Sequence, residues 1–359
     1  MTGTSADGLD WCQVRFSGKG PYPRFEVLDS NTIPYPSNLH ARFLRTLDLT
    51  STELAAAHFA LGRWLGRACR DLATGCDAIA NHGQTLVHAP PEYTLQIGLA
   101  DAIRRHTGLP VIHDLRSADV LAGGQGAPLI PVVDDLLFQP RTDWVVALNI
   151  GGIANFTLLP PQSTNDPIRA WDTGPGNMLL DAVIQEYSKG KLQYDKDGEL
   201  ALRGKLNPGM LDFLQTHPYL SLTPPKSAGR EQFGAAYLSS VIEQFNPRKD
   251  QDWYDLLHTL ACFTADCVAD EWSRDHAGEI PAAIWVSGGG AHHPLIMDRL
   301  RMHFRPAPVQ ALSLNGVDTD NKEAFGFAYL GYLNLRRLPA NLPSVTGAAE
   351  KVILGQIAW

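Results

Sequence analysis

The stretch "AWDTGPGNMLLDAV", residues 170–183, joins a strand end to a helix through a turn of unusual composition. The apolar residues before Asp172 suit a strand, and those from Met178 to Val183 suit one face of a helix. Two glycines and a proline between them let the backbone come close to a bound group. Two interpretations follow: Asp172 caps a tight turn, or it is a catalytic carboxylate beside an anion site.

Composition limits the function classes. The chain has 359 residues, of which 44% are apolar and 19% charged, which predicts two globular domains or one large one. A formal net charge of −8 argues against nucleic acid as the main partner. Five scattered cysteines without C-x-x-C spacing indicate reduced thiols. Because there is also no signal peptide and no long apolar run, we expect a soluble, cytoplasmic protein.

Strands alternate with helices along the chain, which predicts an α/β fold with mostly parallel sheets. Thr50 and Glu53 have the spacing of a capping box at the start of the best early helix. A strand, a Gly-Gly turn and a second strand span residues 143–160, where the strand and helix series restarts. We therefore expect two α/β halves, with a strand pair at 11–35 and later helices near 252–275 and 322–337.

Four glycine-rich turns lie at strand ends: "GTSADG" (3–8), "NIGGIAN" (149–155), "DTGPGN" (172–177) and "SGGGAHH" (287–293). Each turn taken alone is explained as an ordinary structural turn. Together they favour phosphate or nucleotide binding, because glycine lets successive backbone amides converge on phosphate oxygens. Neither a P-loop nor a G-x-G-x-x-G motif is present. In the first turn, Asp7 suits hydrated Mg²⁺, and an Asx turn is the alternative.

Seven motifs appear in an order that identifies a family: "MTGTSADGLD", "NHGQTLVH", "LAGGQGAPLIP", "LNIGGIANFT", "DTGPGN", "KSAGREQF" and "VSGGGAHHP". The chain resembles the 1,6-anhydro-N-acetylmuramic acid kinases, of the acetate and sugar kinase/heat-shock protein 70/actin superfamily. The resemblance implies two actin-like (ribonuclease H-like) domains with an interdomain active-site cleft that closes over the ligands. Domain I would comprise 1–138 with a C-terminal segment of about 322–359, and domain II would comprise 139–321.

The family's reaction is unusual for a kinase. Water attacks the anomeric carbon of the anhydro sugar, the 1,6-bridge opens, and O6 takes the γ-phosphoryl group of ATP. The product implied is N-acetylmuramic acid 6-phosphate, which returns cell-wall material to amino-sugar metabolism.

By the family's motifs, Asp172 activates the water and Glu323 assists ring opening. The resemblance also implies ATP and Mg²⁺ as cofactors, with Asp7 as a water-mediated metal ligand. Sugar-binding residues would be His82, Gln84, Thr85, Arg116, Asp119 and Gln125. ATP-binding residues would be Gly3, Thr4, Ser5, Ala6, Asp7, Gly8, Leu9, Asp10, Asn149, Gly151, Gly152, Asn155, Gly174, Gly176, Asn177, Gly288, Gly289 and Gly290.

Plainer interpretations stand beside several of these roles. Glu323 is also what a first helical turn favours, because acids there interact well with the helix dipole. His82 at a strand end is otherwise a structural hydrogen-bonding residue, and "GGQGAP" is otherwise a crossover loop.

Two departures from the family pattern affect the expectations. Many relatives carry three consecutive arginines before the "GGQGAP" loop, whereas here Arg116 is followed by Ser117 and Ala118. The family also has an apolar strand ahead of the first loop, whereas this chain starts at Met1 of that loop. The alternatives are thus a sugar or carboxylate kinase with another substrate, or a nucleotide-binding relative without catalysis. Relatives are often dimers, so a homodimer is also expected.

Overall fold

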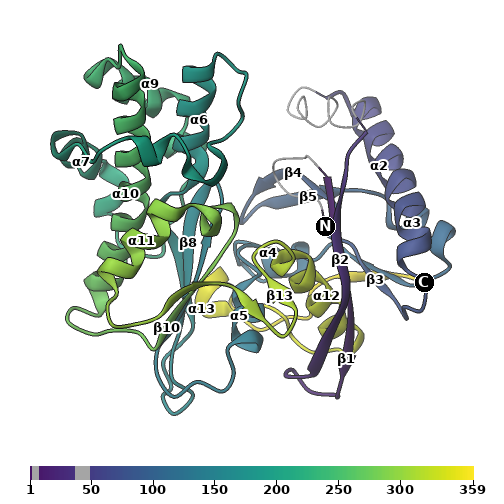
Figure 1. Cartoon of the computed structure of the whole chain (residues 1–359). Helices are drawn as coiled ribbons and strands as arrows, with labels where there is room; N and C mark the ends of the chain where they lie inside the picture. Colours follow the sequence, from purple (N-terminus) through teal and green to yellow (C-terminus); the bar gives the residue numbers. More distant parts are fainter. Residues whose placement is uncertain (2–7, 37–48) are drawn as a thin grey trace. The chain divides into compact units, whose positions relative to one another are not determined.

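The computed structural model describes residues 1, 8–36 and 49–359, which form two compact units (Figure 1). Unit 1 comprises Met1–Leu137, Leu314–Val317 and Asn321–Trp359. Unit 2 comprises Phe138–Ser313 and Asp318–Asp320. Each unit is an α/β structure with its own hydrophobic core, so the expected fold class is confirmed at that level.

Unit 1 contains short sheets. The hairpin β1 (Gly8–Ser17) and β2 (Arg24–Pro34) is antiparallel, as is the pair β4 (Gln84–Ala89) and β5 (Tyr93–Ile97). A third sheet has the order β14 (Gln356–Ala358), β6 (Val111–His113), β3 (Ile79–Ala80). The predicted strand pair is therefore confirmed.

Two sets of helices cover these strands. The helix α2 (Ser51–Leu72) packs on α3 (Ala100–Thr107), and α12 (Lys322–Leu335) packs on β1 and β3. The predicted capping box is confirmed, since Thr50 accepts a hydrogen bond from the Glu53 amide and Glu53 accepts one from the Thr50 amide. The remaining helices of unit 1 are α4 (Ser117–Leu121), α5 (Pro131–Leu137) and α13 (Pro343–Thr346).

Unit 2 is built on one five-stranded sheet of order β11-β10-β7-β8-β9. Its strands are β7 (Val145–Ile150), β8 (Ile153–Leu159), β9 (Arg169–Pro175), β10 (Ala283–Ser287) and β11 (Val309–Ala311). The predicted Gly-Gly hairpin is β7–β8. A short pair, β12 (Ser313–Leu314) and β13 (Val317–Asp318), follows β11.

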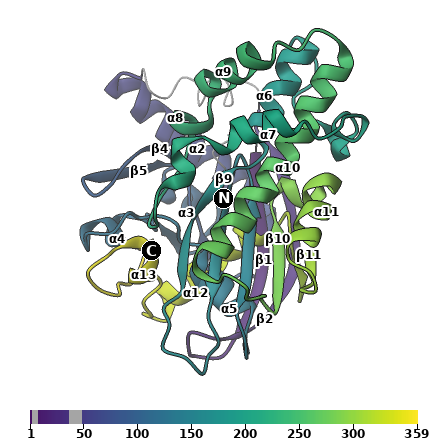
Figure 2. The same ribbon diagram turned by 90° about the vertical axis from the view of Figure 1, so that its left-hand side faces the viewer.

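The long helix α10 (Asp250–Asp275) organises the helical part of unit 2. It contacts strands β8 and β9 and the helices α6 (Asn177–Ser188), α7 (Pro208–Gln215) and α11 (Pro294–His303). Figure 2 shows α10 and α11 beside β10 and β11 within this unit. Helices α8 (Arg230–Phe233) and α9 (Ala235–Phe245) complete it, with short 3₁₀ turns η2 (Lys196–Gly198), η3 (Ala201–Arg203), η4 (Pro218–Ser221) and η5 (Gly289–His292).

One sequence-based expectation is wrong. Parallel pairing is not dominant in the described chain, because β10 pairs in parallel with β7 and β11, and β3 with β6, whereas the other five strand pairs of the main sheets and hairpins are antiparallel. Short connections such as Gly151–Gly152 force antiparallel hairpins. Strand β3 ends in a turn that contains Gly83, with a φ of 71°, and β4 follows it.

The structure describes all five cysteines, and none of them forms a disulfide. Within the described part of the chain, every helix falls short of the length and apolar character that a membrane crossing requires.

Candidate functional site

Asp172 lies on β9, and residues 55 and 56 positions further along the chain hold its carboxylate. Its Oδ2 accepts hydrogen bonds from the Ala228 amide at 2.7 Å and the Ser227 hydroxyl at 3.1 Å. Burial raises the pKa of Asp172, and these two bonds oppose that rise without cancelling it. Among the described residues Oδ1 receives no hydrogen bond. One carboxylate oxygen is therefore fixed, and the other is available to a further donor.

A row of polar side chains crosses the sheet of unit 2 and ends at Asp172. Ser287 on β10 is the register partner of Asn149 on β7, Asn149 pairs with Asn155 on β8, and Asn155 pairs with Asp172 on β9. Directly opposed residues project from the same face of a sheet. The sheet thus lines up two amide side chains between a hydroxyl and the carboxylate.

Three of the predicted glycine turns converge at the edge of the same sheet. The Gly176 amide donates to Gly152 O at 2.9 Å, and the Asn177 amide donates to Gly151 O at 2.8 Å. The third turn packs against the same strand end, because a Cβ added to Gly288 would lie 2.8 Å from Asn149 Oδ1 and Ile150 O. The turns at 151–152, 174–177 and 288–290 are therefore one structural cluster.

The cluster suits the close approach of an anion. It lies before two helix starts, those of α6 and α11, neither of which has a side-chain cap. At α6 the amides of Gly176, Asn177 and Met178 already donate to the carbonyls of Gly151 and Gly152. What the two helix starts offer a phosphate is therefore chiefly the positive end of the helix dipole. A Cβ added to Gly151 would meet no atom closer than 3.7 Å, so a methyl group fits there in ordinary van der Waals contact. The residues present fit a phosphate-bearing ligand such as ATP.

In unit 1, buried His82 and half-buried Arg116 form a polar pair. Arg116 Nε donates to His82 Nε2 at 3.0 Å, and His82 Nδ1 lies 2.9 Å from Gly83 O. The proton of His82 is therefore on Nδ1. Burial, followed by the Arg116 charge, lowers the pKa of His82 to about 3, and burial lowers the pKa of Arg116 to about 10. His82 is a neutral, oriented side chain at neutral pH.

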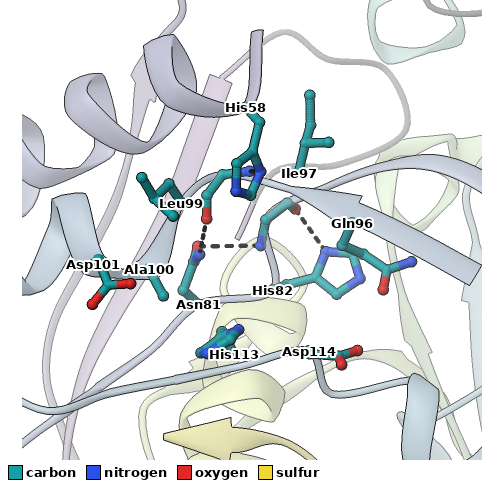
Figure 3. A pocket seen from close by; sticks show the side chains of 12 residues that line it. His58, Asn81, His82, Gln96, Ile97, Leu99, Ala100, Asp101, His113 and Asp114 are labelled. Carbon is teal, nitrogen blue, oxygen red and sulfur yellow. Dashed lines mark hydrogen bonds between the residues drawn. The ribbon is translucent and has the colours of Figure 1, made fainter. Parts of the chain in front are cut away.

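His82 also borders a cavity of about 100 Å³ whose lining is rich in polar side chains (Figure 3). Its walls include His58, Asn81, Gln96, Asp101 and His113. Asn81 Nδ2 donates to Gly98 O at 3.3 Å, and the Gly83 amide donates to Asn81 Oδ1 at 3.1 Å. Planar amides, imidazoles and carboxylates are the groups that recognise hydroxyl-rich ligands.

The other predicted sugar-binding residues lie near this region with different roles. Gln84 is buried, and its Oε1 has no hydrogen-bond partner within the described chain; Thr85 is the register partner of Gln96. Asp119 is fully buried, and its carboxylate accepts hydrogen bonds from the Gly126 amide and from two side chains, Asn341 and Thr346. Gln125 is exposed, and its amide donates to Thr346 O. Asp119 thus holds the "GGQGAP" loop in place.

Glu323 lies in the first turn of α12, close to the His82–Arg116 pair. The side chain is exposed at the surface, but desolvation by the surrounding protein raises the pKa of its carboxyl group, and the Asp10 carboxylate adds to the rise. The Arg116 charge acts in the opposite direction. The ring of His82 contacts Phe327, one turn further along α12. Unit 1 therefore gathers a carboxyl group, a guanidinium and a neutral imidazole.

Part of the predicted nucleotide site cannot be compared with the structure. Gly3, Thr4, Ser5, Ala6 and Asp7 lie outside the described residues. Gly8 and Leu9 are buried at the start of β1, and Asp10 accepts a hydrogen bond from Thr32 Oγ1 at 2.6 Å. Residues 1, 8–36 and 49–359 hold no group of three histidine, cysteine or acidic side chains that could bind a metal.

Sequence reasoning missed the residues that position Asp172. "KSAGREQF" was noted as a motif without a role, and the structure shows that Ser227 and Ala228 within it bind the carboxylate. The only signal was its place among the collinear motifs, because the contact spans dozens of residues.

Comparison with known proteins decides the family. The protein-family model described as "Anhydro-N-acetylmuramic acid kinase" matches residues 1–359. The chain belongs to the anhydro-N-acetylmuramic acid kinase family. The chain is 41% identical over 367 residues to a family member of Thiobacillus denitrificans, covering 99% of this chain and 95% of that protein. It is 36% identical over 376 residues to one of Synechocystis, covering 99% and 97%.

This anhydro-N-acetylmuramic acid kinase family membership confirms the resemblance seen in the motifs and makes the chain an enzyme, a phosphotransferase with an alcohol acceptor. A substrate of another class and a binding-only role are not favoured. A solved ROK family glucokinase of Streptomyces griseus is similar at 16% identity, covering 89% of this chain and 98% of that chain, with a TM-score of 0.36. That score is too low to argue a shared fold.

Proposed function

We propose that the chain uses ATP and water to convert 1,6-anhydro-N-acetylmuramic acid to N-acetylmuramic acid 6-phosphate, with Asp172 as the base. The observation that carries this proposal is the state of the Asp172 carboxylate. Its Oδ2 is fixed by Ser227 and Ala228, while its Oδ1 receives no hydrogen bond within the described chain, at the sheet edge where three glycine turns meet.

Asp172 Oδ1 accepts a proton from water as the water oxygen bonds to the anomeric carbon. The bond between that carbon and the bridging oxygen breaks, and the oxygen, now O6, bonds to the γ-phosphoryl group as ADP leaves. A carboxylate is a weak base, so its contribution rests on positioning and a raised pKa. Burial of Asp172 supplies that raised pKa.

The glycine cluster is the proposed phosphate-binding part. Amides at Gly152 and Gly288–Gly290, with the side chains of Asn149 and Asn177, would approach the phosphate oxygens at the starts of α6 and α11, while Gly151, whose amide donates to Ile153 O, would let them come close because it has no side chain. Mg²⁺ is proposed as the counter-ion of ATP, where it neutralises phosphate charge. Its proposed ligand, Asp7, lies outside the described residues.

The sugar-binding roles of unit 1 are also proposals. His82, fixed as a neutral Nδ1–H imidazole, and Arg116 would orient the sugar, while Glu323 with its raised pKa would assist the opening of the bridge. Asp119 would contribute to sugar binding indirectly, by holding the "GGQGAP" loop in place. That units 1 and 2 are actin-like domains acting on one substrate stays a prediction, as do a cytoplasmic location and a homodimer.

The reaction is tested by product mass. Incubating the enzyme with ATP and the anhydro sugar in heavy-oxygen water should give a sugar heavier by one phosphoryl group and one heavy oxygen atom. The phosphoryl group should be on O6 and the heavy oxygen at the anomeric carbon. The finished product, incubated for the same time, controls for spontaneous exchange.

A phosphorylated product that retains the bridge, or transfer to acetate or glucose in preference to the anhydro sugar, would contradict the proposed function.

A further inference from the structure

The segment that holds Asp172 is itself anchored by a buried ion pair that the reaction does not use. Lys226 Nζ lies 2.7 Å from Glu271 Oε1, and both side chains are 2% exposed. Lys226 also lies over the ring of Tyr219, 4.7 Å from its centroid. A buried pair of charges is costly to form, so its presence here calls for a role beyond stability.

Glu271 connects both chain segments that meet at Asp172. Its Oε1 binds Lys226, which directly precedes the Ser227–Ala228 pair on the carboxylate. Its Oε2 accepts from the Trp171 indole at 2.8 Å, and Trp171 directly precedes Asp172. One carboxylate on α10 therefore sets the distance between the base and the groups that hold it.

Tyr219 closes the same network from η4. Its hydroxyl donates to Asp172 O at 2.7 Å, and the Asp172 amide donates to Lys226 O at 3.3 Å. Arg274 lies 3.1 Å from Glu271 Oε1 and donates to Leu220 O and Leu222 O, which fixes the segment after Tyr219. Asp172 is thus held through its backbone as well as its side chain.

We infer that the Lys226–Glu271 pair is a positioning device for the base, which keeps Ser227 and Ala228 on Oδ2 and leaves Oδ1 turned toward the reacting water. This inference rests on the proposed function of Asp172. Lys226 and Glu271 touch neither substrate nor reacting atoms, so they act only through Asp172.

The inference predicts a shift in the pH profile, with a definite sign. The Ala228 and Ser227 bonds lower the pKa of Asp172 against burial, so weakening them raises that pKa. The base must be ionised, and therefore the acid limb of kcat should move to higher pH. Titratable groups facing Asp172 are Tyr219 and Glu231; those facing Glu271 are Lys226, Arg274, Tyr219, Cys267 and Asp270.

Glu271→Gln is the main variant, because it keeps the shape and removes the charge that Lys226 needs. We expect kcat to fall on the order of 10- to 100-fold, since small misplacements of a reacting group have effects of that size. The KM values for ATP and the sugar should stay near wild type, and the acid limb should move up by roughly half a pH unit or more.

If Glu271→Gln fails to fold, two further variants test whether the Lys226–Glu271 pair positions Asp172. The double variant Lys226→Met/Glu271→Gln removes both buried charges, which proteins often tolerate, and it should fold yet keep the low kcat and shifted limb. Ser227→Ala, at an exposed position, should shift the limb in the same direction by less, and Ser227→Thr should restore it.

Asp266→Asn is the matched control. Asp266 is also a buried carboxylate on α10, but it pairs with Arg299 and His303 on α11. This variant should lose stability without moving the acid limb. The inference would be overturned if the acid limb of the kcat profile stayed at the wild-type pH in Glu271→Gln, in the double variant and in Ser227→Ala. An equal shift of that limb in Asp266→Asn would overturn it as well. Asp172→Asn run in parallel separates the two proposals, because full turnover in that variant would sink the proposed function itself.

Discussion

An aspartate carboxylate is a weak base, because its ordinary pKa is about 4. Burial makes Asp172 a stronger base by raising its pKa. Its hydrogen bonds show why the sequence could suggest the residue but not its surroundings. The strand, turn and helix pattern around 170–183 is local, so it is visible in the sequence. The bonds to Ser227 and Ala228 and the Trp171–Glu271 contact, 100 residues apart, depend on tertiary packing that no local pattern records.

Arg116 illustrates the same limit. The sequence showed that Arg116 stands without its neighbouring arginines, which left its role open. In the structure Nε donates to His82 and Nη1 donates to Gly126 O at 2.7 Å, so the residue orients both a histidine and the "GGQGAP" loop. Ser117, which follows Arg116, donates to Asp114 Oδ1.

His82 should make the fold sensitive to acid. Its folded pKa of about 3 lies below its ordinary value, so the unfolded chain binds more protons between those values and stability falls as pH falls through that range. Lowering the pH from about 7.5 to about 5 should cost the wild type about 2 kcal/mol more than His82→Gln. Urea unfolding at both pH values measures the difference.

His292→Gln is the control for this prediction, because His292 is exposed. It should keep the wild-type dependence on pH. If wild type and His82→Gln lost the same free energy of unfolding between the two pH values, burial of His82 would not be the cause of the acid sensitivity.

Turns and strand pairs were predicted unevenly. The Gly-Gly hairpin and the capping box were predicted correctly, because each depends on residues only a few positions apart in the sequence. The preference for parallel strands was wrong, and α5 and the helices between 188 and 250 were not predicted at all. The pairing β11-β10-β7 joins segments far apart in the chain, and their partners are chosen by packing.

Gly151→Ala separates structure from binding within the glycine cluster. A Cβ there would meet no atom closer than 3.7 Å and the residue has no positive φ, so the melting temperature should stay near wild type. The added methyl would occupy space proposed for phosphate oxygens. We expect ATP binding to weaken about tenfold, or about 1.4 kcal/mol, by calorimetry.

Gly209→Ala is the matched control on α7, since its nearest neighbour would also be 3.7 Å away. It should leave both stability and ATP binding unchanged. If Gly151→Ala binds ATP as wild type does, the 151–152 turn is not a phosphate contact.

Each of the two units contributes a different kind of chemistry. Unit 2 holds the fixed carboxylate and the glycine cluster, and unit 1 holds the neutral imidazole, the guanidinium and the carboxyl group of Glu323. An antiparallel hairpin lies near the start of each unit, β1–β2 in unit 1 and β7–β8 in unit 2. The net charge of −8 is compatible with an anionic ligand because the phosphate-binding groups proposed are glycine amides and the positive ends of helix dipoles rather than basic side chains.

The most direct measurement is turnover of Asp172→Asn with ATP-dependent thermal stabilisation recorded on the same preparation. Asparagine keeps the size of the side chain and can still accept from Ala228, but it cannot take a proton from water. ATP at about 100 times its Kd should stabilise variant and wild type alike, by about 2.7 kcal/mol. Turnover of the anhydro sugar should fall about 10²- to 10⁴-fold. Turnover near the wild-type level, with ATP still bound, would contradict the assignment of Asp172 as the base.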